Sequence, residues 1–270
     1  MQIDTFMTIG KNHKVCEDYI LSGTNPIPYI IISDGCSSSK GSDMGARLLC
    51  FLAQQYIKFR QPQTEKFAPD HNEMGLWIIH NAELVGKQLG LPKNSLDATL
   101  IIAYKAFNYD NCVRVHLYGD GCIVHFGPEF LNIKIIEYSK NAPYYLSYKI
   151  DIERNLLYHQ MLQEKFIKTY SSEQSDSSLE RFHYDIPFTF HYNLGVEKNG
   201  LLIASDGLAS FFRFNSSIIS FPAYVENFFA FKTTKGEFLK RRANKELKTL
   251  AKEGIYNADD LSIGAFLLEE

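Results

Sequence analysis

The sequence lacks the features of several common classes of protein. Among its 270 residues there is no run near the roughly 20 apolar residues that a membrane helix needs. Residues 1–5 do not begin the basic segment and apolar stretch of a secretory signal. The five cysteines form no C-x-x-C pair and are odd in number, which argues against a disulfide framework and favours a reducing compartment. The net charge of -3 gives no basic field for nucleic acid. We therefore expect a cytoplasmic protein without nucleic-acid or membrane partners.

The amino-acid composition is typical of a globular domain with a sizeable core. Hydrophobic residues make up 45% of the chain and charged residues 22%. The 20 Phe and 16 Tyr favour a strand-rich structure. With no linker or internal repeat evident, we expect residues 1–270 to form a single domain, and we expect a monomer.

Apolar patterning predicts strands in blocks, with helices between the blocks. The predicted strands are residues 19–22, 29–33, 98–104, 112–118, 123–126, 201–205 and 261–268. The predicted helices are residues 42–59, 72–89 and 235–252. Helix 42–59 is expected to bury Met44, Leu48, Leu52 and Tyr56, and helix 72–89 to bury Met74, Trp77, Ile78 and Val85. This order indicates an α+β fold with antiparallel sheets and helices packed outside.

Three segments are expected to connect these elements without forming strands or helices of their own. Residues 108–111 are predicted to form a turn, and Asp120-Gly121 a tight hairpin between the strands on either side. Residues 140–190 read as an irregular, flap-like segment. It is Tyr-rich, and within it the polar residues 171–178 look like a mobile loop. Tyr144, Tyr145 and Tyr148 in this segment fit either a substrate-facing flap or core packing.

Acidic residues lie at one end of four of the apolar runs. Asp34, Asp120 and Asp206 each stand before a glycine at the end of a run, and Asp259-Asp260 precedes the last run. Asp-Gly alone is a common turn signal. If the four strand ends converge, however, the carboxylates repel one another and need cations between them to stay ionised. The pattern therefore predicts a multi-metal site with oxygen ligands.

The order of the motifs along the chain is more specific than any one of them. The order is His13-x-x-x-Glu17-Asp18, Ser33-Asp34-Gly35, Gly41-x-x-x-Gly45-Ala46, Ala98-Thr99, Gly119-Asp120-Gly121, Ala204-Ser205-Asp206-Gly207 and Asp259-Asp260-Leu261-Ser262. This order resembles the metal-dependent protein phosphatases of type 2C, which remove phosphate from phosphoserine and phosphothreonine. The resemblance spans about residues 10–268. The Ser-rich loop after Gly35 is similar to that of the bacterial branch, which acts in signalling.

The resemblance implies an α-β-β-α sandwich, with two antiparallel sheets and helices on both outer faces. It implies that Asp34 bridges two Mn²⁺ or Mg²⁺ ions and that the Gly35 carbonyl binds one of them. Asp206 and Asp259 would complete the coordination of the other ion, and Asp120 would help to bind a third ion. Glu17 and Asp18 would hold metal-bound waters. A water bridging two such ions loses a proton easily and can attack phosphorus directly, so no protein nucleophile is needed.

Three positions depart from the family pattern. His13 stands where most members have an arginine that binds the substrate phosphate, and an imidazole cannot make the bidentate pair. Lys14 or Lys11 could replace that charge. Cys36 stands where many members have a histidine proposed as general acid. Asp260 stands where an asparagine is common.

These departures keep other functions open. The main expectation is a phosphoserine/phosphothreonine protein phosphatase that acts on phosphorylated proteins, with a Ser/Thr kinase and its targets as partners. One alternative is a pseudophosphatase that binds phosphoproteins without turnover. Another is a metal-dependent phosphatase of small metabolites, with the flap closing over the site.

Overall fold

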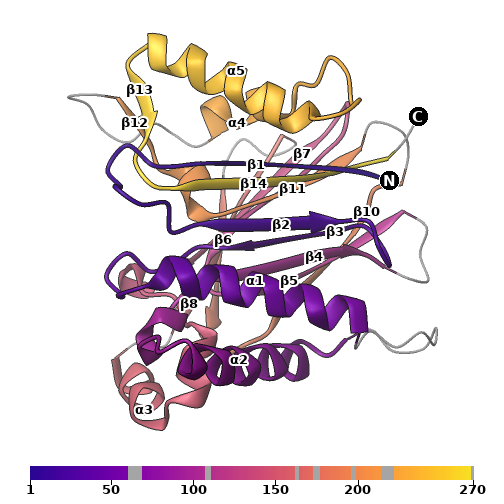
Figure 1. Cartoon of the computed structure of the whole chain (residues 1–270). Coiled ribbons are helices and arrows are strands. Elements are labelled where there is room, and N and C mark those ends of the chain that lie inside the picture. The colour runs from indigo at the N-terminus through magenta and orange to yellow at the C-terminus, as the bar shows by residue number, and fades with distance from the viewer. Residues whose placement is uncertain are drawn as a thin grey trace.

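The computed structural model describes residues 1–59, 69–106, 111–161, 164–172, 177–195, 199–213 and 222–268. Two antiparallel sheets lie face to face, with helices outside each of them (Figure 1). This is the α+β sandwich that the sequence predicts. No helix in these ranges is long and apolar enough to cross a membrane.

The larger sheet has seven strands and the smaller has five. The strands of the larger sheet, in spatial order, are β1 (Gln2–Thr8), β14 (Leu261–Leu267), β11 (Gly200–Ala204), β6 (Gly121–Phe126), β7 (Leu131–Tyr138), β8 (Glu164–Ser171) and β9 (Ser178–His183). Those of the smaller sheet are β10 (Phe188–Asn193), β5 (Cys112–Tyr118), β4 (Leu100–Lys105), β3 (Tyr29–Ser33) and β2 (Tyr19–Gly23). A short ribbon pairs β12 (Phe211–Arg213) with β13 (Ile255–Asn257).

Helices cover the outer face of each sheet. The long helices are α1 (Ser42–Phe59), α2 (His71–Gln88) and α5 (Phe238–Lys252), and the shorter ones are α3 (Ile152–Met161) and α4 (Pro222–Phe229). Helices α1 and α2 lie against the smaller sheet, and α4 and α5 against the larger (Figure 1). Short 3₁₀ turns are η1 (Lys93–Leu96), η2 (Ser139–Asn141), η3 (Leu146–Ile150) and η4 (Asp206–Ala209).

Three apolar cores hold these layers together, because the central strands have two buried faces. Along β3, Ile30 and Ile32 pack between the sheets, while Ile31 packs against the helices. Along β11, Leu201 and Ile203 face the core between the sheets and Leu202 faces α4 and α5. Unbroken apolar runs are what such doubly covered strands require.

Most predicted elements are present, with boundaries within about three residues. The predicted strands 29–33 and 112–118 match β3 and β5. The predicted apolar face of α1 is partly wrong, because Met44 is 43% exposed while Leu49 is fully buried. In α2, Met74 and Ile78 are buried as predicted, whereas Trp77 and Val85 are only half-buried.

The predicted hairpin at Asp120-Gly121 is wrong. The strand before it, β5, belongs to the smaller sheet and the strand after it, β6, to the larger, so the chain crosses between sheets here. Gly119 and Gly121 have φ values of +93° and +144°, which residues with a side chain rarely adopt. The crossing thus places Asp120 between the two sheets rather than at the tip of a hairpin.

The segment around 140–190, predicted to be irregular, contains regular structure. It holds α3, β8 and β9, as well as the start of β10. The predicted mobile loop at 171–178 lies partly outside the described residues, as does the turn at 108–111. Strand β9 is almost wholly exposed, so its sequence lacks the alternation of apolar and polar residues that predicts a strand.

Candidate active site

Strand register brings the predicted acidic residues to one end of the sandwich. Tyr19 pairs with Ser33, so Asp18 and Asp34 flank the same end of the smaller sheet. In the larger sheet, Ala204 pairs with both Cys122 and Ile263. The residues just beyond these pairs include Asp206, Asp120 and the Asp259-Asp260 pair, which therefore lie at the same end.

The carboxyl groups at this end are close enough to change one another's protonation. Burial, together with the charges of Asp18, Asp206 and Asp120, raises the pKa of Asp34 well above its usual value. Burial and the charge of Asp206 raise the pKa of Asp120, and burial and the charge of Asp259 raise the pKa of Asp206 to about 6. Asp206 also shares a hydrogen bond with Asp34. Carboxylates that raise one another's pKa in this way attract cations.

Asp18 is deeply buried, and a serine holds it in place. Its side chain is buried and accepts a hydrogen bond of 2.8 Å from the Ser205 hydroxyl to Oδ2. The same Ser205 oxygen accepts the Ser262 backbone N–H at 3.0 Å. Burial raises the pKa of Asp18 to about 7. The serine before Asp206 thus links β11, β14 and the start of β2.

Glu17 and Gly35 come together on the other side of Asp34. The Glu17 carboxylate accepts a hydrogen bond of 3.1 Å from the Ser42 hydroxyl at the start of α1. The Gly35 N–H donates to the Glu17 carbonyl at 3.2 Å. Burial raises the pKa of Glu17. The Ser-rich loop and α1 therefore fix the orientation of the Glu17 side chain.

Asp259 and Asp260 have different surroundings. The Asp260 side chain is buried, and its two oxygens accept the Gly10 N–H at 2.8 Å and the Glu17 N–H at 2.6 Å. The Asp259 side chain is 38% exposed. Asp260 therefore ties the segment after β1 to the start of β14, and Asp259 is left facing the solvent side.

His13 lies between these two acids. Its Nε2 is 3.2 Å from Asp259 Oδ1, and its Nδ1 is 3.2 Å from Asp260 Oδ2. Partial burial lowers the pKa of His13, but the two carboxylates outweigh it and leave the pKa raised. Lys14, the other residue predicted to bind phosphate, is exposed.

Cys36 and Tyr145 form a contact that the sequence did not single out. The Cys36 sulfur lies 3.1 Å from the Ser38 hydroxyl and is hydrogen bonded to Tyr145. Burial alone would raise the pKa of the Cys36 thiol, but these hydrogen bonds leave it lowered. The Tyr145 side chain is 9% exposed and interacts electrostatically with Asp120. Tyr145 from the 140–190 segment thus borders the acidic cluster.

A buried acid, Asp97, fastens that segment to the loop after Gly35. Its Oδ2 accepts the Ser39 hydroxyl at 2.9 Å and the Arg154 guanidinium at 2.7 Å. Its Oδ1 accepts the Ser147 hydroxyl at 2.6 Å. Its backbone carbonyl accepts the Cys36 N–H at 2.9 Å. An acid directly before the Ala98-Thr99 motif was the signal in the sequence that could have drawn attention to it.

The donor set suits a divalent cation, although its geometry is not that of a finished metal site. Within the described ranges, no three His, Cys, Asp or Glu side chains are placed so that they could hold one ion. The available donors are nevertheless all oxygens, as Mg²⁺ and Mn²⁺ prefer. Among the described residues, Asp206 Oδ1 is buried without a hydrogen-bond partner. Ions bound here would depend on waters to complete their coordination.

Comparisons with known proteins agree with this fold. Residues 10–143 match the family model described as protein phosphatase 2C. The serine/threonine phosphatase of S. agalactiae superposes with a TM-score of 0.57 over 99% of both chains, at 14% identity. Serine/threonine phosphatase Stp1 from Staphylococcus aureus gives 0.56 at 12% identity, covering 100% of this chain and 95% of Stp1. The photosystem II phosphatase PBCP gives 0.55 at 13% identity, covering 99% and 98%.

No curated protein sequence matches this chain significantly. The structural matches show a shared fold, and the range matched by the family model includes Glu17, Asp18, Asp34 and Asp120. The chain belongs to the protein phosphatase 2C family. This confirms the family that the motif order predicts.

Proposed function

We propose that this protein is a metal-dependent phosphatase of phosphoserine and phosphothreonine in proteins. The observation that carries the proposal is the convergence of Asp34, Asp120 and Asp206 into one cluster, in which burial and the charges of neighbouring carboxylates raise all three pKa values. Such mutual repulsion costs stability, and divalent cations would relieve it. The family and the similar solved structures, which are serine/threonine phosphatases, support the reaction class.

Each acidic residue of the site has a proposed role. Asp34 and the Gly35 carbonyl would hold two Mn²⁺ or Mg²⁺ ions together with Asp206 and Asp259, and Asp120 would bind a third. When bound, these ions would neutralise phosphoryl charge and make a water acidic at neutral pH. The carboxylate of Glu17, oriented by Ser42, would accept hydrogen bonds from water in the site.

The surrounding groups would position the phosphoryl group and its leaving alcohol. His13 carries a raised pKa, so a larger share of the imidazole is cationic near neutral pH than in free histidine. Its two nitrogens face carboxylates, so phosphate would bind through Lys14 or through ions rather than through a bidentate pair. Tyr145 can donate a hydrogen bond beside Cys36, where a leaving oxygen would need one.

A phosphothreonine peptide and p-nitrophenyl phosphate test the proposal. We expect hydrolysis with Mn²⁺, none with a chelator, and loss of activity in Asp34→Asn, with Glu129→Gln as a surface control. Binding of the phosphopeptide without turnover would instead favour a pseudophosphatase. Turnover of small phosphate esters but not of phosphopeptides would favour a metabolite phosphatase. Phosphorylated proteins and a cognate Ser/Thr kinase are the partners that the proposal implies.

A further inference from the structure

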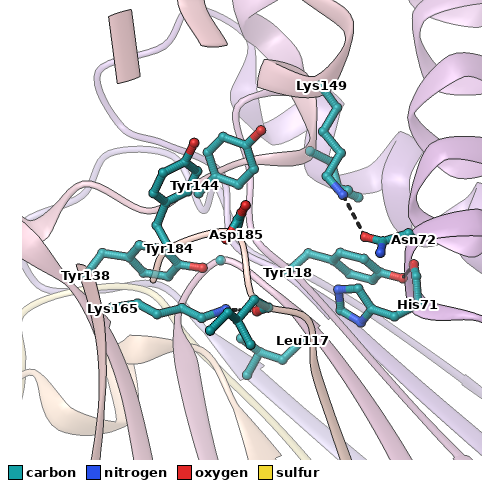
Figure 2. A pocket seen from close by; sticks show the side chains of 13 residues that line it. His71, Asn72, Leu117, Tyr118, Tyr138, Tyr144, Lys149, Lys165, Tyr184 and Asp185 are labelled. Carbon is teal, nitrogen blue, oxygen red and sulfur yellow. Dashed lines mark hydrogen bonds between the residues drawn. The ribbon is translucent and has the colours of Figure 1, made fainter. Parts of the chain in front are cut away.

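A second pocket lies beside the acidic cluster, between α2, the 140–190 segment and the crossing from β5 to β6. Its interior leaves about 20 Å³ for the centre of a water-sized sphere, and its empty space is about 330 Å³ when the open solvent at its mouth is included. Its lining includes His71, Tyr118, Gly119, Lys149, Lys165 and Tyr184. Gly119 directly precedes Asp120, so the pocket adjoins the proposed catalytic centre. Figure 2 shows Lys149 and Lys165 reaching into it from different sides.

Both lysines are held in the pocket without an ion pair. Lys165 is 3% exposed; its ammonium donates to the Ile186 carbonyl and lies 3.5 Å from the centroid of the Phe188 ring. The Lys149 ammonium donates to Asn72 Oδ1 at 3.1 Å (Figure 2). In the part of the chain that the structure describes, neither forms a salt bridge. A buried ammonium group costs free energy unless an anion compensates its charge. The two lysines are therefore available to bind an anion.

The nearby carboxylates are engaged elsewhere. Asp185 lines the pocket but pairs with His183 Nδ1. Asp70 caps α2, accepting the Glu73 N–H at 2.9 Å. Their charges reach the lysines only at longer range.

The charges of the two lysines act on the histidine in the pocket, although the charge of Asp185 partly offsets them. Burial, followed by the charges of Lys149 and Lys165, lowers the pKa of His71 to about 3. Burial likewise lowers the pKa of Lys165 to about 7. His71 is the first residue of α2, an 18-residue helix whose N-terminus adds further positive potential. The pocket's walls are close together, so a small anion suits it better than a large ligand.

We propose that this pocket is a second oxyanion site, in which Lys149 and Lys165 bind a phosphate group next to the catalytic centre. Two sources share this chemistry: inorganic phosphate, and a second phosphoryl group on a substrate peptide. The link to substrate rests on the proposed phosphatase function, whereas binding of free phosphate does not.

The first experiment measures binding of inorganic phosphate by calorimetry with EDTA present, at constant ionic strength and at pH 6.5 so that Lys165 is mostly protonated. Chelation removes any contribution from bound ions. We expect saturable binding of one equivalent, weakened about tenfold in Lys165→Met and in Lys149→Met, because each removes a charge-assisted hydrogen bond. Lys168→Met is the matched control, since Lys168 is three residues along β8 and on its opposite face.

Binding that is absent, or equal in wild type and both pocket variants, overturns the proposal. Thermal melts identify any variant that fails to fold. Methionine keeps the unbranched shape of the Lys165 stem, and Lys149→Gln provides a second, milder variant of the less buried lysine.

The second experiment compares kcat/KM for peptides with one and with two phosphoryl groups, in the presence of Mn²⁺. A preference for the doubly phosphorylated peptide that disappears in the pocket variants assigns the site to substrate. Equal values combined with phosphate binding assign it to the free anion. If no peptide is hydrolysed while phosphate binds in EDTA, the proposed function fails and the oxyanion site stands; turnover without phosphate binding gives the opposite result.

Discussion

The acidic cluster should make the metal-free protein less stable as the pH rises. Asp206 has a pKa of about 6 in the folded protein against 3.8 for the free side chain. Between these values the folded state keeps a proton that the unfolded chain has lost. The cost of ionising Asp206 is therefore absent below pH 3.8, grows through this window and is complete above about pH 6. At about 1.4 kcal/mol per pKa unit, it reaches about 3 kcal/mol.

Urea unfolding in EDTA, at pH 4 and at pH 8, tests this for wild type, Asp206→Asn and the surface control Glu129→Gln. We expect Asp206→Asn to be more stable than wild type by up to about 3 kcal/mol at pH 8 and equal to it at pH 4. Comparing variants at one pH cancels the contributions of buried groups such as His71 and Lys165, which are the same in both. Saturating Mn²⁺ should make wild type more stable than Asp206→Asn at pH 8, because only wild type retains the full set of metal ligands. Wild type as stable as Asp206→Asn at pH 8 in EDTA would refute the reasoning.

Three further changes test other parts of the site. Arg154→Met leaves Asp97 without its cation, so the free energy of unfolding should fall by about 2 kcal/mol and KM for a phosphopeptide should rise. An unchanged KM in steady-state kinetics would show that Asp97 does not position the flap-like segment. His13→Arg should lower that KM about tenfold and weaken its dependence on pH between 6 and 8, as a pH series of KM would reveal. Gly207→Ala would put a Cβ 1.8 Å from the Asp260 carbonyl oxygen, and thermal melts should show a loss of about 3 kcal/mol.

Sequence patterning located the acids but not the way the chain brings them together. Asp34 and Asp206 end unbroken apolar runs, which predict doubly covered strands such as β3 and β11. The Asp120-Gly121 pair looks the same in a hairpin and in a crossing between sheets, because both need glycine at positive φ. Only the strand order, with β5 and β6 in different sheets, separates the two cases.

The oxyanion pocket could not have been predicted from the sequence. Lys165 and Lys149 are ordinary lysines in a segment without apolar periodicity, and lysine is mostly a surface residue. Their burial follows from long-range contacts: η3 packs against α2, and the Lys165 ammonium lies over the Phe188 ring. The role of Asp97 could not be predicted from the sequence either, because its partners Ser39 and Arg154 lie 58 and 57 residues away along the chain.

The two departures at His13 and Asp260 form one feature of the fold. Taken separately, a histidine in place of arginine weakens phosphate binding, and an aspartate in place of asparagine adds repulsion to a crowded site. In the structure the His13 ring lies 3.2 Å from the Asp260 carboxylate, so each charge offsets the other. Asp260 also accepts the Gly10 N–H on one oxygen and the Glu17 N–H on the other, whereas the side chain of an asparagine has a single acceptor oxygen. His13 is therefore oriented by Asp260, and replacing either residue alone by a neutral one leaves a charge in the site without its partner.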